Sequence, residues 1–229
     1  MKKLFALSLL GIFFVSCSSD DDGGGGAPLA TTPDAKVEHD DSSFGIYKGI
    51  FIGSSGVVFI NVNNEDGISS KIVIDGATHN FTTTETATDG DPISGLTFTS
   101  GAMSFDFNCD SDGDNAYITN IDLPGHPNAE MMVIKEFSDI QVKCYRGTYN
   151  GDDSGTFNLI ITQDGWVDGM IRPNGETEST FLTGSVEDND ISGSFSGGVF
   201  VGTVNGNNAS GQWSNMFEEN GNWSGQRKL

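Results

Sequence analysis

The feature that most restricts the fold of this chain is an internal repeat with a spacing of 98 residues. The residues that match across this spacing are Tyr47 and Tyr145, Gly49 and Gly147, Phe59 and Phe157, and Ile93-Ser94-Gly95 and Ile191-Ser192-Gly193. One constant spacing over this length indicates a tandem duplication. We therefore expect two modules, module 1 at residues 44–140 and module 2 at residues 141–229.

Both modules have the sequence pattern of short β-strands. In module 2, apolar and polar residues alternate in about eight short runs, which are separated by turn sequences such as Asp152-Asp153-Ser154-Gly155 and Asn205-Gly206-Asn207-Asn208. Eight antiparallel strands with one apolar face can close on themselves, which leaves no exposed edge. The sequence thus predicts an all-β fold with two tandem antiparallel meanders of about eight strands each, as small closed or nearly closed β-barrels. Residues 131–137 fit either a strand or one helical turn.

The N-terminus has the pattern of an export signal. Lys2 and Lys3 precede an apolar run at 4–15 that is too short to span a bilayer, and the small residue Ser16 then precedes Cys17. This arrangement resembles the lipobox of bacterial lipoproteins, and the following Ser18-Ser19-Asp20-Asp21-Asp22 resembles the export tag of surface lipoproteins in the Bacteroidota. The alternative is an ordinary signal peptide that is cut elsewhere and leaves a free thiol.

The lipoprotein resemblance implies a location and an anchor. Residues 1–16 would be removed, Cys17 would be acylated, and the protein would be held in the outer membrane by lipid, facing the cell exterior. Residues 17–43 are rich in glycine and polar residues without apolar periodicity, so we expect a lipidated flexible tether there.

The charge of the chain restricts its partners. The formal net charge is −21, which disfavours nucleic acid, because nucleic acid binding requires basic patches. We expect contact with the membrane through the N-terminal lipid, and a glycan or an envelope protein as the ligand.

Two cysteines remain beyond the N-terminal region. Cys109 and Cys144 would lie in an oxidising compartment after export, where they can form a disulfide. The distance between them cannot be read from the sequence, so two separate buried thiols remain the alternative.

Two further groups of residues are candidate binding sites. Asp110, Asp112 and Asp114 alternate along the chain, as the ligands of a calcium loop do, but the same pattern also suits a solvated hairpin turn. Trp166 directly follows the turn residues Asp164-Gly165 and is a candidate for stacking on a sugar ring, although most tryptophans in a small barrel fill its core. No cofactor other than this possible calcium is expected.

No catalytic motif is recognisable in the sequence. The three histidines, at 39, 79 and 126, do not have zinc-ligand spacing, and there is neither a nucleophile elbow nor a phosphate loop. The sequence therefore favours a non-enzymatic, lipid-anchored binding or accessory protein. A hydrolase of extracellular polysaccharide or peptide, with acidic residues as acid and base, is one alternative, and a structural subunit of an envelope complex is another.

Overall fold

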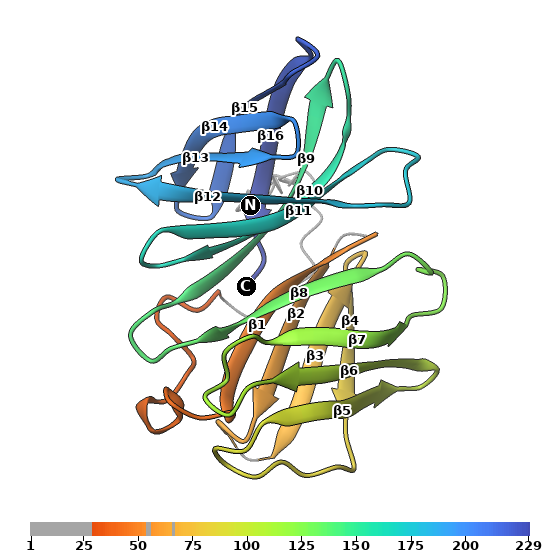
Figure 1. Cartoon of the computed structure of the whole chain (residues 1–229), viewed down its shortest axis with the longest axis vertical. Helices are drawn as coiled ribbons and strands as arrows, with labels where there is room; N and C mark the ends of the chain where they lie inside the picture. Colours follow the sequence, from red (N-terminus) through yellow and green to blue (C-terminus); the bar gives the residue numbers. More distant parts are fainter. Residues whose placement is uncertain (1–28, 54–55, 66) are drawn as a thin grey trace, which may run out of the picture.

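The computed structural model describes residues 29–229 except 54, 55 and 66. The chain forms two eight-stranded antiparallel units that are stacked along the long axis of the molecule (Figure 1). This confirms the predicted all-β fold with two tandem meanders. Cys17 and the signal sequence lie outside the described residues.

Module 1 is a nearly closed barrel in which strands adjacent in sequence are also adjacent in space. Its last strand, β8, pairs with its first strand, β1, but not with β7, so the barrel is open between β7 and β8. The strands β4 and β5 are joined by a single residue pair, Thr82 with Thr99. A 3-10 turn, η1 (Val37–His39), precedes the strands β1 (Gly45–Ile52), β2 (Gly56–Val62), β3 (Ile68–Ile74), β4 (Ala77–Thr82), β5 (Ile93–Ser100), β6 (Met103–Cys109), β7 (Tyr117–Asp122) and β8 (Glu130–Glu136). The ambiguous segment at 131–137 is therefore mostly strand.

Module 2 is a closed barrel with the same order of strands. Its last strand, β16, pairs with its first strand, β9, over a full ladder. The strands are β9 (Val142–Gly151), β10 (Gly155–Thr162), β11 (Trp166–Pro173), β12 (Thr180–Glu187), β13 (Asp190–Phe195), β14 (Gly198–Asn205), β15 (Asn208–Asn215) and β16 (Asn220–Arg227). Because both modules share one topology, the connection between them lies between β8 and β9.

The repeat does not keep one spacing throughout. Tyr47 and Tyr145 are both fully buried inside their barrels, as a spacing of 98 requires. In the next strand, however, Gly49 pairs with Val58, whereas Gly147 pairs with Phe157. Phe157 therefore corresponds to Val58, and its predicted match with Phe59 is wrong. The first hairpin of module 2 is one residue longer, and a shift of one residue in a strand exchanges its inner and outer faces.

Aromatic rings fill the interior of module 1. Phe98 stacks on Phe105 with ring centroids 5.2 Å apart, and Phe81 meets Phe105 edge to face. Tyr47 packs against Phe107 in the same way. All five side chains are essentially inaccessible to solvent, so this barrel has a dense core of the kind that stabilises small domains.

A second apolar layer joins the two barrels. The outer face of β1, with Ile50 and Ile52, packs against Val142 and Cys144 of β9 and Ile160 of β10. At the same junction, the side-chain amide of Asn158 donates a hydrogen bond of 2.8 Å to the carbonyl oxygen of Phe51. The outward faces of these strands are therefore buried as well, and the modules share one continuous interface.

A buried ion pair lies at the edge of this junction. Lys48 on β1 and Glu136 at the end of β8 have side chains that are 2% and 0% exposed, and Lys48 Nζ lies 2.7 Å from Glu136 Oε1. Lys48 also contacts Asp34 at 2.7 Å. The Glu136 carboxylate accepts further hydrogen bonds from the backbone N–H groups of Asp34 and Val142. The cluster thus links the N-terminal segment, module 1 and the first residue of β9 in module 2.

The N-terminal segment is more ordered than the sequence suggests. Ala30 O accepts hydrogen bonds from Gln141 and Arg227, and Asp40 accepts bonds from the backbone and hydroxyl of Ser138. Lys36 N donates to Asn64 Oδ1. The prediction of a flexible tether is therefore wrong for residues 29–43, where polar side chains that suggested solvation instead bind the junction. Any tether lies within 17–28, outside the described residues.

The part of the chain that the structure describes includes no helix with the length and apolar character needed to cross a bilayer.

Removing the charge of Glu136 should strongly destabilise the protein. Glu136→Gln has one acceptor oxygen and can keep only one of the two backbone hydrogen bonds, which go to different carboxylate oxygens. It also leaves Lys48 with the partly exposed Asp34 as its remaining counter-charge, and breaking a buried pair in this way typically costs about 3–5 kcal/mol. The free energy of unfolding from guanidinium denaturation measures this loss.

The matched control for this measurement is Lys36→Ala. Lys36 pairs with Glu65 at 3.3 Å, but these side chains are 41% and 70% exposed, so the loss should be below about 1 kcal/mol. Equal effects of the two substitutions would contradict a stabilising role for the buried cluster.

Candidate functional site

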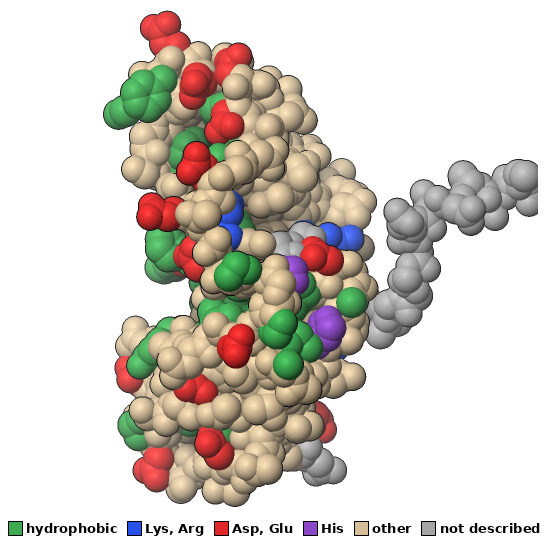
Figure 2. Space-filling model, turned by 90° about the vertical axis from the view of Figure 1, so that its right-hand side faces the viewer, with side chains coloured by type: hydrophobic (Ala, Val, Ile, Leu, Met, Phe, Trp, Pro, Cys, Tyr) green, Lys and Arg blue, Asp and Glu red, His purple; other side chains and the backbone are tan. Residues whose placement is uncertain are grey.

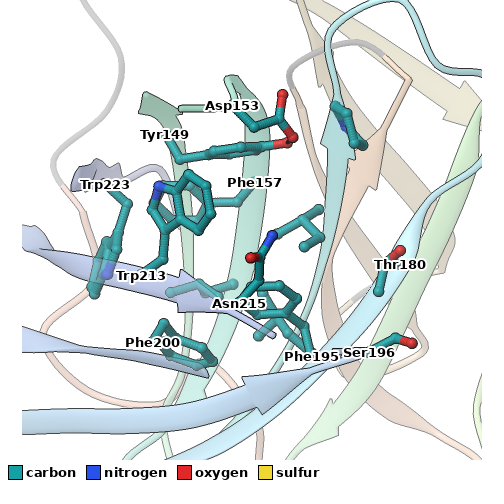
Figure 3. A pocket seen from close by; sticks show the side chains of 14 residues that line it. Tyr149, Asp153, Phe157, Thr180, Phe195, Ser196, Phe200, Trp213, Asn215 and Trp223 are labelled. Carbon is teal, nitrogen blue, oxygen red and sulfur yellow. Dashed lines mark hydrogen bonds between the residues drawn. The ribbon is translucent and has the colours of Figure 1, made fainter. Parts of the chain in front are cut away.

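The candidate site is a cavity at one end of the module 2 barrel. It has a volume of about 200 Å³ and opens at the end where the turns β9–β10, β11–β12, β13–β14 and β15–β16 lie. It is lined by Tyr149, Asp153, Phe157, Leu159, Ile171, Pro173, Thr180, Leu182, Phe195, Ser196, Phe200, Trp213, Asn215 and Trp223 (Figure 3). Six of these residues are aromatic, and they come from six different strands.

The cavity ends where large rings fill the middle of the barrel. Trp223 meets Phe157 edge to face at 5.4 Å and Phe200 at 6.2 Å between ring centroids. These rings fit because glycines face them: a Cβ on Gly147 would overlap the ring of Phe157, and a Cβ on Gly193 would overlap that of Phe200. At these two positions the wall lacks side chains, which gives the rings room inside the barrel.

The indole N–H groups of the cavity are already used within the protein. Trp213 Nε1 donates to Asn150 O at 3.2 Å, and Trp223 Nε1 donates to Gln212 O at 3.1 Å. Trp213 also meets Tyr149 edge to face at 5.7 Å. The two tryptophans are thus held in fixed positions, and they offer ring surface to a ligand instead of hydrogen-bond donors.

Polar groups lie at the mouth. Tyr149 Oη donates to Asp153 Oδ2 at 3.4 Å, and Asp153 Oδ1 also accepts from Ser154 N at 2.6 Å. Burial and the adjacent Asp153 carboxylate raise the pKa of the Tyr149 phenol, so this hydroxyl stays protonated at neutral pH. Asn215 is engaged in the β15–β16 turn, where its amide binds Glu219. Thr180 and Ser196 add two hydroxyl groups to the lining.

Trp166 is not part of this cavity. It begins β11 at the opposite end of the barrel, is 61% exposed, and its backbone N–H donates to the Thr162 hydroxyl. Its stacking on a sugar stays a prediction.

Trp213, Trp223 and Tyr149 were not predicted from the sequence as site residues. Their inward positions in alternating strands were recognisable, but the open end of the barrel was not.

The aspartates at 110, 112 and 114 form a hairpin turn. Gly113 N donates to Asp110 O, Asp114 N donates to Asp112 Oδ1, and Asn115 Nδ2 donates to Asp110 Oδ2 at 2.7 Å. Two of the three carboxylates are therefore engaged within the loop. No group of three His, Cys, Asp or Glu side chains that could hold a metal occurs among the described residues. The structure gives the calcium prediction no support beyond the spacing in the sequence.

The two cysteines are separate free thiols. Cys109 lies in the core of module 1, where Tyr47 Oη contacts its sulfur at 3.5 Å, whereas Cys144 lies in the apolar layer between the modules. The sequence left a disulfide and two separate thiols as alternatives, and in the structure the two thiols are separate. Burial raises the pKa of the Cys144 thiol to about 12, and it also raises the pKa of Cys109.

No protein-family model matches this chain, and no curated protein is significantly similar to it in sequence. The function therefore has to be argued from the geometry of the site.

The buried thiols should not react in the folded protein. A thiolate is the reactive form, so Cys109 and Cys144 should stay inert toward Ellman's reagent at pH 8 and react only after unfolding in guanidinium. The measurement is the increase in titrated thiol on unfolding, with reduced glutathione as a reactive control. A disulfide-linked peptide pair found by mass spectrometry without reduction would contradict the arrangement.

Proposed function

We propose that this protein is a lipid-anchored, non-enzymatic binding protein of the outer membrane and that module 2 holds a small ligand in the mouth of its barrel. The observation that carries this proposal is the aromatic cavity. Module 1 packs its rings into a dense core, whereas module 2 leaves an open space of about 200 Å³ beside its rings. Deep apolar pockets with a few polar groups at their edge are typical ligand sites.

The size of the cavity restricts the ligand. Sites for drug-sized molecules usually have volumes of roughly 300–1,000 Å³. A space of about 200 Å³ suits a smaller molecule or one end of a larger one, such as the terminal residue of a glycan. The apolar walls favour a ligand with an apolar face.

The acidic groups of the site favour binding over hydrolysis. Among the described residues that line the cavity, Asp153 is the one carboxylate. Glycoside hydrolysis usually requires a pair of carboxyl groups about 5–10 Å apart, one on each side of the scissile bond. The lining also supplies no histidine or cysteine that could act as a base or nucleophile. These features support a binding role.

Indole signals in a ¹H–¹⁵N NMR spectrum test the cavity directly, because all three tryptophans of the chain lie in module 2. We expect that a library of small neutral, cationic and anionic compounds, including mono- and disaccharides, contains a binder that shifts Trp213 and Trp223 but not Trp166. Thr180→Phe places a ring in the mouth and should weaken binding by roughly tenfold or more.

The matched control is Thr183→Phe, which adds the same ring to an exposed position on the same strand and should leave binding unchanged. A library in which no compound at millimolar concentration moves the cavity signals would refute the proposed binding function. A saccharide that moves only Trp166 would instead support the exposed stacking site.

The anchor is tested by replacing the acylated residue. Cys17→Ser removes the only thiol that the lipobox resemblance assigns to lipid, so the protein should lose incorporated radiolabelled palmitate and leave the membrane fraction. Ser18→Ala, one residue away, is the control and should keep both. Membrane association that persists in the Cys17→Ser variant would contradict the proposed attachment.

A further inference from the structure

The mouth of the cavity carries a concentrated negative charge. Four turns surround it, at residues 152–154, 174–179, 196–197 and 216–219. Together they carry six carboxylates and no lysine, arginine or histidine: Asp152, Asp153, Glu176, Glu178, Glu218 and Glu219. The three turns at the opposite end, at 163–165, 188–189 and 206–207, carry Asp164 and Asp188, and Glu187 and Asp190 flank the second of them. The basic residues Lys143, Arg227 and Lys228 also lie at that end, where β9 begins and β16 ends. The excess of negative charge therefore lies at the open end.

One arginine lies near these six carboxylates but does not pair with any of them. None of them takes part in an ion pair within the described part of the chain, where the contacts of Asp152 and Glu219 are to neutral asparagine groups. The nearest basic side chain in sequence, Arg172, is not part of the lining. Its guanidinium donates to Ser179 Oγ, in the turn at 174–179, at 2.7 and 3.0 Å, and it pairs with Glu130 of module 1 at 2.9 Å.

The surface view agrees with this distribution. Basic side chains gather near the junction of the modules, and acidic side chains surround a hollow with apolar side chains in the upper module (Figure 2). Carboxylates of one sign around an apolar opening focus the electrostatic field there and attract cations.

The walls also suit a cation. The face of an aromatic ring carries negative electrostatic potential, and a cation within about 6 Å of the ring centroid is attracted to it. Tyr149, Trp213 and Trp223 lie on neighbouring strands, with their polar hydrogens directed to Asp153, Asn150 and Gln212. What they present to the cavity is ring surface, and Asp153 adds one carboxylate at the entrance.

We propose that this cavity binds a small organic cation whose charge is carried by a methylated ammonium group. A primary ammonium needs three hydrogen-bond acceptors, which the aromatic walls do not supply. A methylated ammonium is apolar at its surface and positive at its centre, so it matches both the rings and the acidic entrance. This inference rests on the proposed function, since it names the ligand class of the same cavity.

Three ligands of one shape test the inference. Choline, 3,3-dimethylbutan-1-ol and 3,3-dimethylbutanoate each carry a quaternary centre with three methyl groups, and their charges are positive, zero and negative. Titrations of the intact protein, followed by the Trp213 and Trp223 indole signals, should give choline an affinity about tenfold higher than that of the alcohol. The carboxylate should bind more weakly than either. Added salt should weaken choline binding and leave the alcohol unaffected.

Asp153→Asn is the variant that removes the carboxylate of the lining. It should weaken choline binding about three- to tenfold and leave the alcohol unchanged. Asp164→Asn, at the closed end of the same barrel, removes the same charge far from the cavity and should have little effect. Equal losses in the two variants would overturn a specific role for the entrance.

Methylated ammonium groups occur both in free small molecules and in lipid headgroups. Phosphatidylcholine vesicles form a second arm of the test, with phosphatidylglycerol vesicles as control. Cosedimentation with phosphatidylcholine alone would identify a lipid source, whereas choline binding without cosedimentation would identify a soluble cation.

Equal affinity for choline and the alcohol would overturn the cation inference and leave the cavity as a neutral binding site. If none of the three binds, the cation inference fails, and the wider library decides separately whether the cavity binds anything.

Discussion

The fixed width of an eight-stranded barrel is the constraint on which the rest of this structure depends. The interior must be filled by side chains that the wall can accommodate. Module 1 meets this requirement with large rings, such as Phe98, Phe105 and Phe107, packed together with aliphatic side chains. Module 2 concentrates its rings in the middle, opposite glycines such as Gly147 and Gly193, and leaves one end open. The same topology therefore gives a packed unit and a hollow unit.

The outward faces are constrained by the contact between the barrels. The strands at the junction are apolar on both faces, because their inner face belongs to a barrel core and their outer face to the layer between the modules. Lys48 and Glu136 place a charge pair at the edge of this layer. A buried pair contributes little net stability compared with apolar residues but is costly to break. Both side chains belong to module 1, and the Glu136 carboxylate also accepts a hydrogen bond from Val142 N at the start of β9, so a different docking of module 2 would lose this bond to a buried charge.

Much of the fold could be predicted from the sequence, because alternation and turn residues define strands locally. Eight strands in module 2 follow from runs such as those that became β10 and β11. The repeat was recognisable, but the match of Phe59 with Phe157 failed because one extra residue in a hairpin reverses the inner and outer faces. The order of residues 29–43 was not predictable, since it depends on backbone groups, such as Ala30 O, that meet distant side chains.

The candidate site was less predictable than the fold. Trp166 stood out because it follows a turn, whereas Trp213 and Trp223 resembled ordinary core residues. Rings from different strands pack against one another inside the barrel, and their packing determines which end is filled. Trp223, for example, packs against Phe157 and Phe200. That information is three-dimensional, and the spacing of residues along the chain does not contain it.

The N-terminal segment enters the folded part at the junction of the two barrels, not at either end of the molecule (Figure 1). An acyl group on Cys17, as proposed, would be separated from Leu29 by a chain that spans at most roughly 40 Å. The protein would then be attached at the junction between its barrels, close to the lipid surface, with one barrel on either side of the attachment point. A ligand would have to reach the module 2 barrel in the space next to the membrane.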